Sequence, residues 1–311
     1  MSSTVRFLST LVIFGALATT PAIAAEAESC RKPRIADGGW TDNTAQNGFL
    51  TAVLKGLGYQ PQVDLLGVPV ILTSMKQGTT DIWLDNWMPS QTAEVGPYLK
   101  DGSIESLAIN LEGAGYGPVV PNYVADSGVK DLKDLGGHAD KFEHKLYGIE
   151  PGNDGNRILQ SKIDDPGNNL KDWQLVESSE QGMLAQAEKD MAKQKWIAFL
   201  AWTPHPVMGR MQITYLTGFE KDGFGPAKIH TLVRAGYVKE CPNVGKLLNN
   251  VKFTLDMESA VMERILAGED AEKTAAEWFK ANPSVFETWL QGVTTFEGAD
   301  GLPAVKKQLG L

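Results

Sequence analysis

Four aromatic residues of this 311-residue chain stand where an expected strand ends or a loop begins. They are Trp40, Trp87, Tyr116 and Trp202. In open α/β sheets the carboxyl ends of the strands face the ligand crevice, so this placement brings the rings to one region. Several electron-rich ring faces around one cavity form a cage for a quaternary ammonium group, which has no N–H to donate. The same positions are also consistent with core packing or with stacking on a carbohydrate.

The stretch DIWLDNWMPS, residues 81–90, separates two tryptophans by four positions. Trp83 lies inside the apolar run and is expected to pack in the core. Trp87 is expected just past the end of the strand, before Pro89 turns the chain away. We therefore expect Trp87, rather than Trp83, to contact a ligand.

Polar residues near the aromatic positions have two interpretations each. Asp42 follows Trp40 by two residues and is either a helix cap or first-turn carboxylate, or a cleft-facing acceptor. In the cleft it would attract a cation, accept a hydrogen bond from a ligand hydroxyl and disfavour a ligand carboxylate. Asn153 and Asp154, in the Gly-rich segment YGIEPGNDGNR, are either turn residues or ligand contacts.

Catalytic and metal-binding patterns are not found in the sequence. No Ser-His-Asp set, Cys-His pair or telling carboxylate pair emerges, and His205 in WTPHP is expected to be a loop or hinge residue. Two distant cysteines and four scattered histidines give no metal-ligand spacing. The sequence therefore favours a binding protein without cofactor or metal over an enzyme.

The first 24 residues have the pattern of a secretory signal peptide. An early Arg6 precedes an apolar stretch, and Ala22-Ile23-Ala24 offers a small-residue cleavage site, so cleavage is expected after Ala24 or Ala25. The apolar stretch is too short for a membrane-spanning helix. We expect an exported, soluble protein whose net charge of −9 argues against nucleic acid as a partner.

Export also bears on the two cysteines, Cys30 and Cys241. In an oxidising compartment they can form a disulfide that closes a loop of about 210 residues and contributes at most about 5 kcal/mol. Two free thiols are the alternative.

Strand-like and helix-like segments alternate along most of the chain. Residues 31–39, 61–68 and 81–87 are predicted as strands, with helices over 41–60 and 69–80 between them. A Gly- and Pro-rich segment, 113–128, precedes a second alternating block, and the chain after 242 is mainly helical by periodicity. The expected fold is α/β and two-lobed: residues 25–114 and 212–311 form lobe 1, residues 115–211 form lobe 2, and a ligand binds between them.

Six segments together resemble the periplasmic choline-binding proteins of bacterial ABC importers, within the glycine betaine and quaternary-amine substrate-binding family. They are GGWTDNTA, DNWMPS, YGIEPGNDGNR, VESSEQGMLAQ, AWTPHPV and AGYVKECPNVGKLL. The resemblance spans essentially the whole chain after the signal segment. It implies a type II periplasmic binding protein, each lobe a mixed, mostly parallel sheet flanked by helices, with a two-crossover hinge that closes on the ligand.

The resemblance also implies a set of residues and partners. The aromatic box falls on Trp40 and Trp87 of the first lobe and on Tyr116 and Trp202 of the second. The ligand hydroxyl end falls to Asp42 and Asn153, and the disulfide to Cys30 and Cys241. The implied protein is a periplasmic monomer that delivers a ligand to a membrane-embedded permease.

Choline is the expected ligand because Asp42 would disfavour a ligand carboxylate. The sequence departs from the family pattern at GYGPVVPN and at TDNTAQNG, both beside the box. Carnitine and glycine betaine, which share the trimethylammonium head, therefore stay alternatives. A secreted choline-ester hydrolase is the alternative of another class, against which the missing nucleophile–base pair argues.

Overall fold

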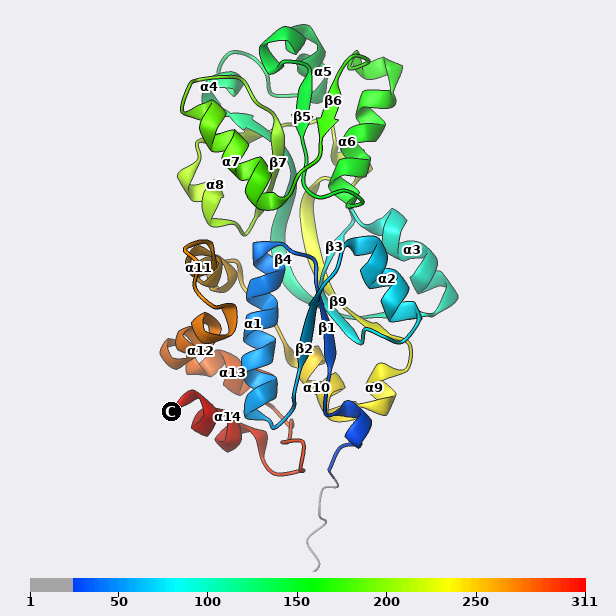
Figure 1. Cartoon of the computed structure of the whole chain (residues 1–311), viewed down its shortest axis with the longest axis vertical. Helices are drawn as coiled ribbons and strands as arrows, with labels where there is room; N and C mark the ends of the chain where they lie inside the picture. The colour runs from blue at the N-terminus through cyan, green and yellow to red at the C-terminus, as the bar shows by residue number, and fades with distance from the viewer. Residues whose placement is uncertain (1–24) are drawn as a thin grey trace, which may run out of the picture.

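The structure, a computed structural model, describes residues 25–311 (Figure 1). The predicted signal segment, residues 1–24, lies outside the described residues. Two lobes are visible, one above the other in Figure 1, and two long strands run between them. Among residues 25–311, no helix combines the length and apolarity needed to cross a membrane.

The first lobe opens with the predicted β-α-β-α-β unit. Its elements are β1 (Arg34–Asp37), α1 (Thr41–Gly56), β2 (Gln62–Leu65), α2 (Val68–Lys76) and β3 (Ile82–Met88), followed by α3 (Thr92–Asp101). Strand β1 pairs in parallel with both β2 and β3. The parallel arrangement follows from the helical crossovers, which return the chain to the same edge before each new strand.

The C-terminal helices complete the first lobe, as the sequence predicts. They are α9 (Tyr237–Glu240), α10 (Pro242–Asn250), α11 (Leu255–Leu266), α12 (Ala271–Ala281), α13 (Pro283–Trp289) and α14 (Gly301–Leu309). Helix α1 is buried between the sheet and α11, α12 and α14 (Figure 1). Its Phe49 lies edge-on against Phe279 at 5.0 Å, and Gly48 lets the helix approach the Ala271 carbonyl so closely that a Cβ would lie 2.6 Å away. This packing fixes the position of the N-terminus of α1.

The second lobe is built around three short strands. Its elements are α4 (Asn122–Ala125), α5 (Leu132–Leu135), β5 (Lys145–Tyr147), α6 (Asp154–Asp164), β6 (Gln174–Val176), α7 (Glu180–Met191), β7 (Phe199–Thr203), α8 (Pro206–Arg210) and β8 (Ile213–Tyr215). Strand β5 pairs in parallel with β6 and β7. The α/β class and the two-lobed architecture expected from the sequence are thus confirmed.

Strands β4 (Ile104–Pro121) and β9 (Gly225–Arg234) connect the lobes. Across residues 25–311 the strands form one nine-stranded sheet in the order β2-β1-β3-β9-β4-β7-β5-β6, with β8 paired to β4. The sequence predicts a separate sheet for each lobe, whereas the antiparallel pairing of β4 with β9 makes the sheet continuous.

The lobe boundaries are affected by the same pairing. Strand β8 lies beside Val119–Pro121 at the second-lobe end of β4, although the expected boundary of 211 assigns it to the first lobe. Pro204 and Pro206 end β7 but lead only into the short helix α8. We therefore propose that the chain returns to the first lobe through β9, from Gly225 onward.

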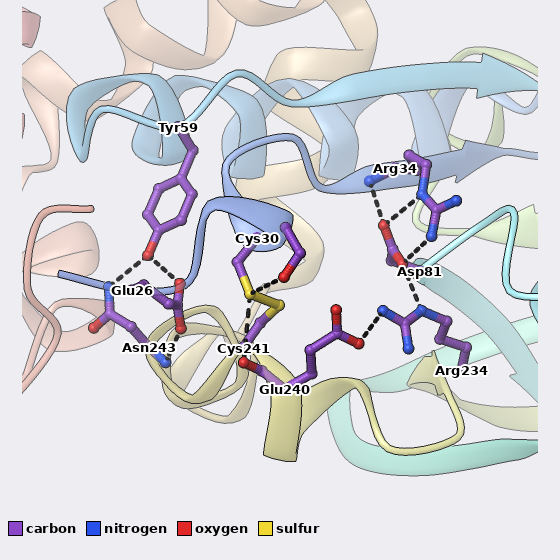
Figure 2. The surroundings of a disulfide bond; sticks show 10 residues. Glu26, Cys30, Arg34, Tyr59, Asp81, Arg234, Glu240, Cys241 and Asn243 are labelled. Carbon is purple, nitrogen blue, oxygen red and sulfur yellow. Dashed lines mark hydrogen bonds and ion pairs between the residues drawn. A yellow bond between two sulfur atoms is a disulfide. The ribbon is translucent and has the colours of Figure 1, made fainter. Parts of the chain in front are cut away.

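A disulfide joins Cys30 to Cys241 at the end of the first lobe far from the second, as predicted (Figure 2). The Cα atoms are 5.6 Å apart, and the bond ties the segment before β1 to the start of α10. Beside it, the Tyr59 hydroxyl donates to Glu26 at 2.6 Å, and Asn243 donates to the same carboxylate. Asp81, also in Figure 2, accepts hydrogen bonds from Arg34 and Arg234. This end of the lobe is crosslinked both covalently and by ion pairs.

Candidate functional site

A cavity between the lobes collects most of the predicted site residues. The space not occupied by protein atoms is about 260 Å³, part of which is open to solvent. Its lining consists of Trp40, Asp42, Trp87, Gln91, Tyr116, Ile149, Asp154 and Trp202. Trp40, Asp42, Trp87 and Gln91 belong to the first lobe, and the other four belong to the second-lobe side. The cavity is therefore complete only when the lobes are together.

The four predicted aromatic rings all line this cavity. Each is buried, with exposed fractions between 4% and 6%. Tyr116 lies in the middle, 5.7 Å from the ring of Trp87 and 6.4 Å from that of Trp202. The plane of Tyr116 is inclined by 57° to that of Trp87 and by 81° to that of Trp202. The rings therefore do not stack face to face, and they do not cover each other's faces. The cavity is therefore walled by ring surfaces rather than filled by them.

Two of the indole rings are held by carboxylates. The Nε1 of Trp40 donates to Glu150 of the other lobe at 3.0 Å, and the Nε1 of Trp87 donates to Asp85 at 3.0 Å. These hydrogen bonds fix the ring planes.

The positions of three rings along their strands differ from the prediction. Trp87, Tyr116 and Trp202 lie inside β3, β4 and β7, not past the strand ends. In β3 the pairing with β9 shifts register between Trp83 and Asn86, and such an irregularity redirects the side chains that follow it. Trp83, upstream of the shift, is fully buried and donates to Asn43 at 3.3 Å, as expected for a core residue.

Asp42 lines the cavity from the first turn of α1. The helix begins at Thr41, and Trp40 occupies the cap position, so Asp42 is a first-turn carboxylate and not the cap. Asp42 is 1% exposed, and its Oδ1 has no hydrogen-bond partner among residues 25–311. Burial, followed by the charges of Asp85 and Glu180, holds the pKa of Asp42 well above its ordinary value.

More buried carboxylates lie behind Asp42. Gln46 donates to both Asp85 and Glu258, at 3.3 and 3.0 Å. Burial is the main cause that raises the pKa of each of these acids, and the charge of Glu258 adds to it for Asp85. One oxygen of each acid has no partner within the described part of the chain. The region behind Asp42 is therefore rich in hydrogen-bond acceptors and short of donors.

Asp154 is the second carboxylate of the cavity. It accepts a hydrogen bond from Gln91 of the first lobe at 3.3 Å, while its Oδ2 has no partner among residues 25–311. Burial raises the pKa of Asp154 to about 6. An acidic oxygen that faces the cavity without a hydrogen-bond partner interacts favourably with a positively charged ligand.

Asn153 lies beside the cavity and not in its lining. It caps α6: its Oδ1 accepts from the backbone N–H of Asn156 at 2.9 Å, and its Nδ2 donates to the Glu150 carbonyl. Both polar atoms of the side chain are engaged at the helix end, and the hydroxyl-binding role that the resemblance gives to Asn153 stays a prediction. The neighbouring Asp154, equally weighted in the sequence, points into the cavity instead, because the cap residue turns its side chain back onto the helix end.

Gln91 and Ile149 were missed by the sequence reasoning. Ile149 immediately precedes the Gly-rich turn, and Gln91 follows Trp87 by four residues, where its Oε1 accepts the Trp87 backbone N–H at 3.0 Å. Proximity to Trp87 is the signal that could have found Gln91. His205 lies outside the lining and donates from Nε2 to Glu180 at 3.0 Å.

Comparison with known proteins places this geometry. The family model for the substrate binding domain of ABC-type glycine betaine transport systems, OpuAC, matches residues 34–281. A solved ABC-transporter choline binding protein in complex with choline is 47% identical, with a TM-score of 0.89, covering 92% of this chain and all of that chain. The unliganded semi-closed form of such a protein is 48% identical, with a TM-score of 0.84, covering 91% of this chain and all of that one.

A curated relative extends the comparison to a second ligand class. The glycine betaine/carnitine transport binding protein GbuC of Listeria monocytogenes serotype 1/2a (strain 10403S) is 31% identical over 167 residues. That match covers 53% of this chain and 54% of GbuC.

Proposed function

This chain belongs to the family of substrate-binding domains of ABC-type glycine betaine transport systems, and we propose that its ligand is choline. It is the substrate-binding component of a glycine betaine/choline-type importer, and its relatives are transport proteins rather than enzymes. Choline lies between the lobes, with its trimethylammonium group among Trp40, Trp87, Tyr116 and Trp202.

A single observation carries the proposal: four buried rings and two incompletely bonded carboxylates, Asp42 and Asp154, line one interlobe cavity. A trimethylammonium group offers no N–H, so it is recognised by ring faces and by charge. Each desolvated ring face contributes on the order of 1–2 kcal/mol. Four such faces support micromolar binding, about −8 kcal/mol, after the cost of ordering is subtracted.

The far end of the cavity favours choline over its carboxylated relatives. The hydroxyl of choline can donate to a free oxygen of Asp42 or Asp154. A carboxylate of glycine betaine or carnitine near the same oxygens is repelled by an amount on the order of 1–4 kcal/mol, depending on the local dielectric. The 47% identity with a protein solved in complex with choline supports the same choice.

The wider role follows from the family. Ligand that bridges both lobes stabilises the closed form, and the permease then receives the ligand from that form. We propose that the chain acts in the periplasm as a monomer and is exported by its signal segment, residues 1–24.

Titration calorimetry with choline, carnitine and glycine betaine tests the proposed function. We expect micromolar or tighter binding of choline and weaker binding of the other two. Mass spectrometry of the small molecule released on denaturation identifies any ligand that co-purifies. Millimolar or absent binding of all three compounds would refute the proposal, and a preference for a carboxylated ligand would refute the assignment of the far end.

A further inference from the structure

Glu180 crosses the boundary between the lobes without lining the cavity. It is the first residue of α7 in the second lobe, and it is 1% exposed. Its carboxylate lies at the N-terminus of α1 in the first lobe. The backbone N–H of Thr41 donates to its Oε2 at 2.8 Å, and the Thr41 hydroxyl donates to its Oε1 at 2.5 Å.

His205 holds the Glu180 carboxylate from its own lobe. Its Nδ1 accepts the backbone N–H of Val207 at 3.1 Å, so the ring proton is on Nε2, which donates to Glu180 at 3.0 Å. The His205 ring also lies edge-on to Trp202 at 5.1 Å. Glu180 and His205 thus form a unit of the second lobe that is connected to one wall of the cavity.

Thr41 is the counterpart on the first lobe. It lies between Trp40 and Asp42, both of which line the cavity. The cap residue of α1 is Trp40, whose side chain has no hydrogen-bond acceptor. It therefore makes no capping hydrogen bond to the N-terminus of α1. The helix N-terminus therefore takes its acceptor from the other lobe, where a carboxylate also interacts favourably with the helix dipole.

We propose that Glu180, His205 and Thr41 together form a closure latch that slows ligand release. Glu180 is the positioning residue of this latch. The inference rests on the proposed function, because it assumes a ligand enclosed between the lobes. Separation of the lobes breaks both Thr41 hydrogen bonds and leaves the first N–H of α1 without its acceptor. Glu180 touches no ligand; it acts by holding Trp40 and Asp42 against the second lobe.

Other contacts across the lobe boundary differ in kind. The ion pairs of Arg157 with Glu94 and of Arg210 with Glu263 are partly or largely exposed, so water and salt weaken them. The contacts of Trp40 with Glu150 and of Gln91 with Asp154 involve side chains that line the cavity. The latch combines a fully buried carboxylate with three donors and leaves the cavity lining intact when it is altered.

The test is Glu180→Gln, measured by stopped-flow tryptophan fluorescence with choline. The amide of Gln places an NH₂ group where an acceptor is needed. His205 cannot become the acceptor there, because its Nδ1 accepts from Val207 and its proton therefore stays on Nε2. We expect the dissociation rate to rise at least tenfold and the association rate to stay within about threefold, since the latch forms only on closure. Glu188→Gln, on the exposed side of the same helix, is the matched control and should change neither rate.

Thr41→Ala provides a second variant from the opposite lobe. It removes one of the two Thr41 donors, so we expect a smaller increase in the dissociation rate. In the Glu180→Gln background the same change should add almost nothing, because the interaction is already lost. The latch would be overturned if Glu180→Gln left the dissociation rate unchanged. It would also be overturned if the fold increase in the double variant equalled the product of the fold increases in the two single variants.

Hydrogen–deuterium exchange separates the latch from the identity of the ligand. In the protein saturated with whichever of choline, carnitine and glycine betaine it binds, the peptide that contains the Thr41 amide should exchange faster in Glu180→Gln than in Glu188→Gln, because the closed form holds the Thr41 N–H against Glu180. Equal exchange would overturn the latch even if choline binds. If the wild-type chain binds none of the three compounds, the proposed function fails, and the same comparison without ligand decides the latch, with equal exchange overturning it.

Discussion

Two buried aspartates, one just before strand β3 and one inside it, have opposite environments. Asp81, just before the strand, is 3% exposed and accepts hydrogen bonds from Arg34 at 2.6 Å and from Arg234 at 2.7 Å. Asp85, inside the strand, is fully buried and has Gln46 and the Trp87 indole as its donors. Only the first of them has a cationic partner.

The pKa values of the two aspartates differ accordingly. Burial alone would raise the pKa of Asp81, but the hydrogen bonds from Arg34 and Arg234 outweigh it and hold the pKa below its ordinary value. Burial raises the pKa of Asp85 well above its ordinary value, and the charge of Glu258 adds to the effect. A buried carboxylate with its cations in place supports the fold, whereas the carboxylates buried without them lie in or behind the interlobe cavity, where we propose that a cation binds.

Removing the paired carboxylate should have the largest effect on the fold. We expect Asp81→Ala to lower the free energy of unfolding by about 3 kcal/mol, because it leaves Arg34 without its carboxylate acceptor and Arg234 with Glu240 alone. The affinity for choline should stay within twofold. Chemical denaturation and calorimetry measure the two quantities, and Asp101→Ala, which removes a surface ion pair with Lys76, is the control that should change little. Unchanged stability would contradict the structural role of Asp81.

Removing a ring from the cavity should have the next largest effect, on binding. We expect Trp87→Ala to weaken choline binding at least tenfold, because one ring face of the cage is lost. Trp196→Ala removes a half-buried tryptophan that packs on Phe142 at 5.3 Å and does not line the cavity, so it should leave the affinity unchanged. Calorimetric titration of both variants decides; equal affinities would remove Trp87 from the cage.

Neutralising Asp42 should stabilise the free protein while it weakens binding. We expect Asp42→Asn to raise the free energy of unfolding without ligand by about 1 kcal/mol, since it removes a buried carboxylate that has no cation. Choline affinity should fall several-fold, and glycine betaine affinity should fall less. Equal losses for both ligands would mean that Asp42 does not contact the part of the ligand in which they differ.

The pH dependence of stability should show the smallest effect. Burial raises the pKa of Glu150 to about 7 and that of Asp154 to about 6. Between the ordinary values and these values the folded protein binds more protons than the unfolded chain, so stability should fall as the pH rises from about 5 to 7.

Differential scanning fluorimetry of the ligand-free protein measures this dependence. A decrease in Tm of a few °C is expected, on the order of the shift that 1–2 kcal/mol causes in a domain of this size. The variant Asp154→Asn should flatten the profile, and saturating choline should do the same because a bound cation stabilises the ionised carboxylates. A Tm that rises over this range would contradict the assignment.

Local sequence pattern was sufficient for the order of the elements and for the aromatic set. The alternation of apolar and helical periodicity predicts the β-α-β-α-β opening, and the four rings near expected strand ends all line one cavity. The Cys30–Cys241 disulfide was also anticipated. The first two features depend on residue type and on short-range order, whereas the disulfide, which joins residues 211 positions apart, could be anticipated because two cysteines allow only one pairing.

Other parts of the site depend on one-residue details of backbone geometry. Whether Asn153 or Asp154 lines the cavity follows from which residue caps α6, and the position of Trp87 follows from a register shift against β9. The contact of Glu180 with Thr41 joins residues 139 positions apart. No local pattern contains such information.

The segment DIWLDNW shows both what the sequence determines and what it leaves open. The sequence determines that two aspartates and two tryptophans share one strand region, and that some of them must be buried. They do not distinguish Asp81 from Asp85. The tertiary structure does so, by bringing Arg234 to the first and Glu258 to the second, because the free energy of a buried charge is set by the charges and donors that the fold places around it.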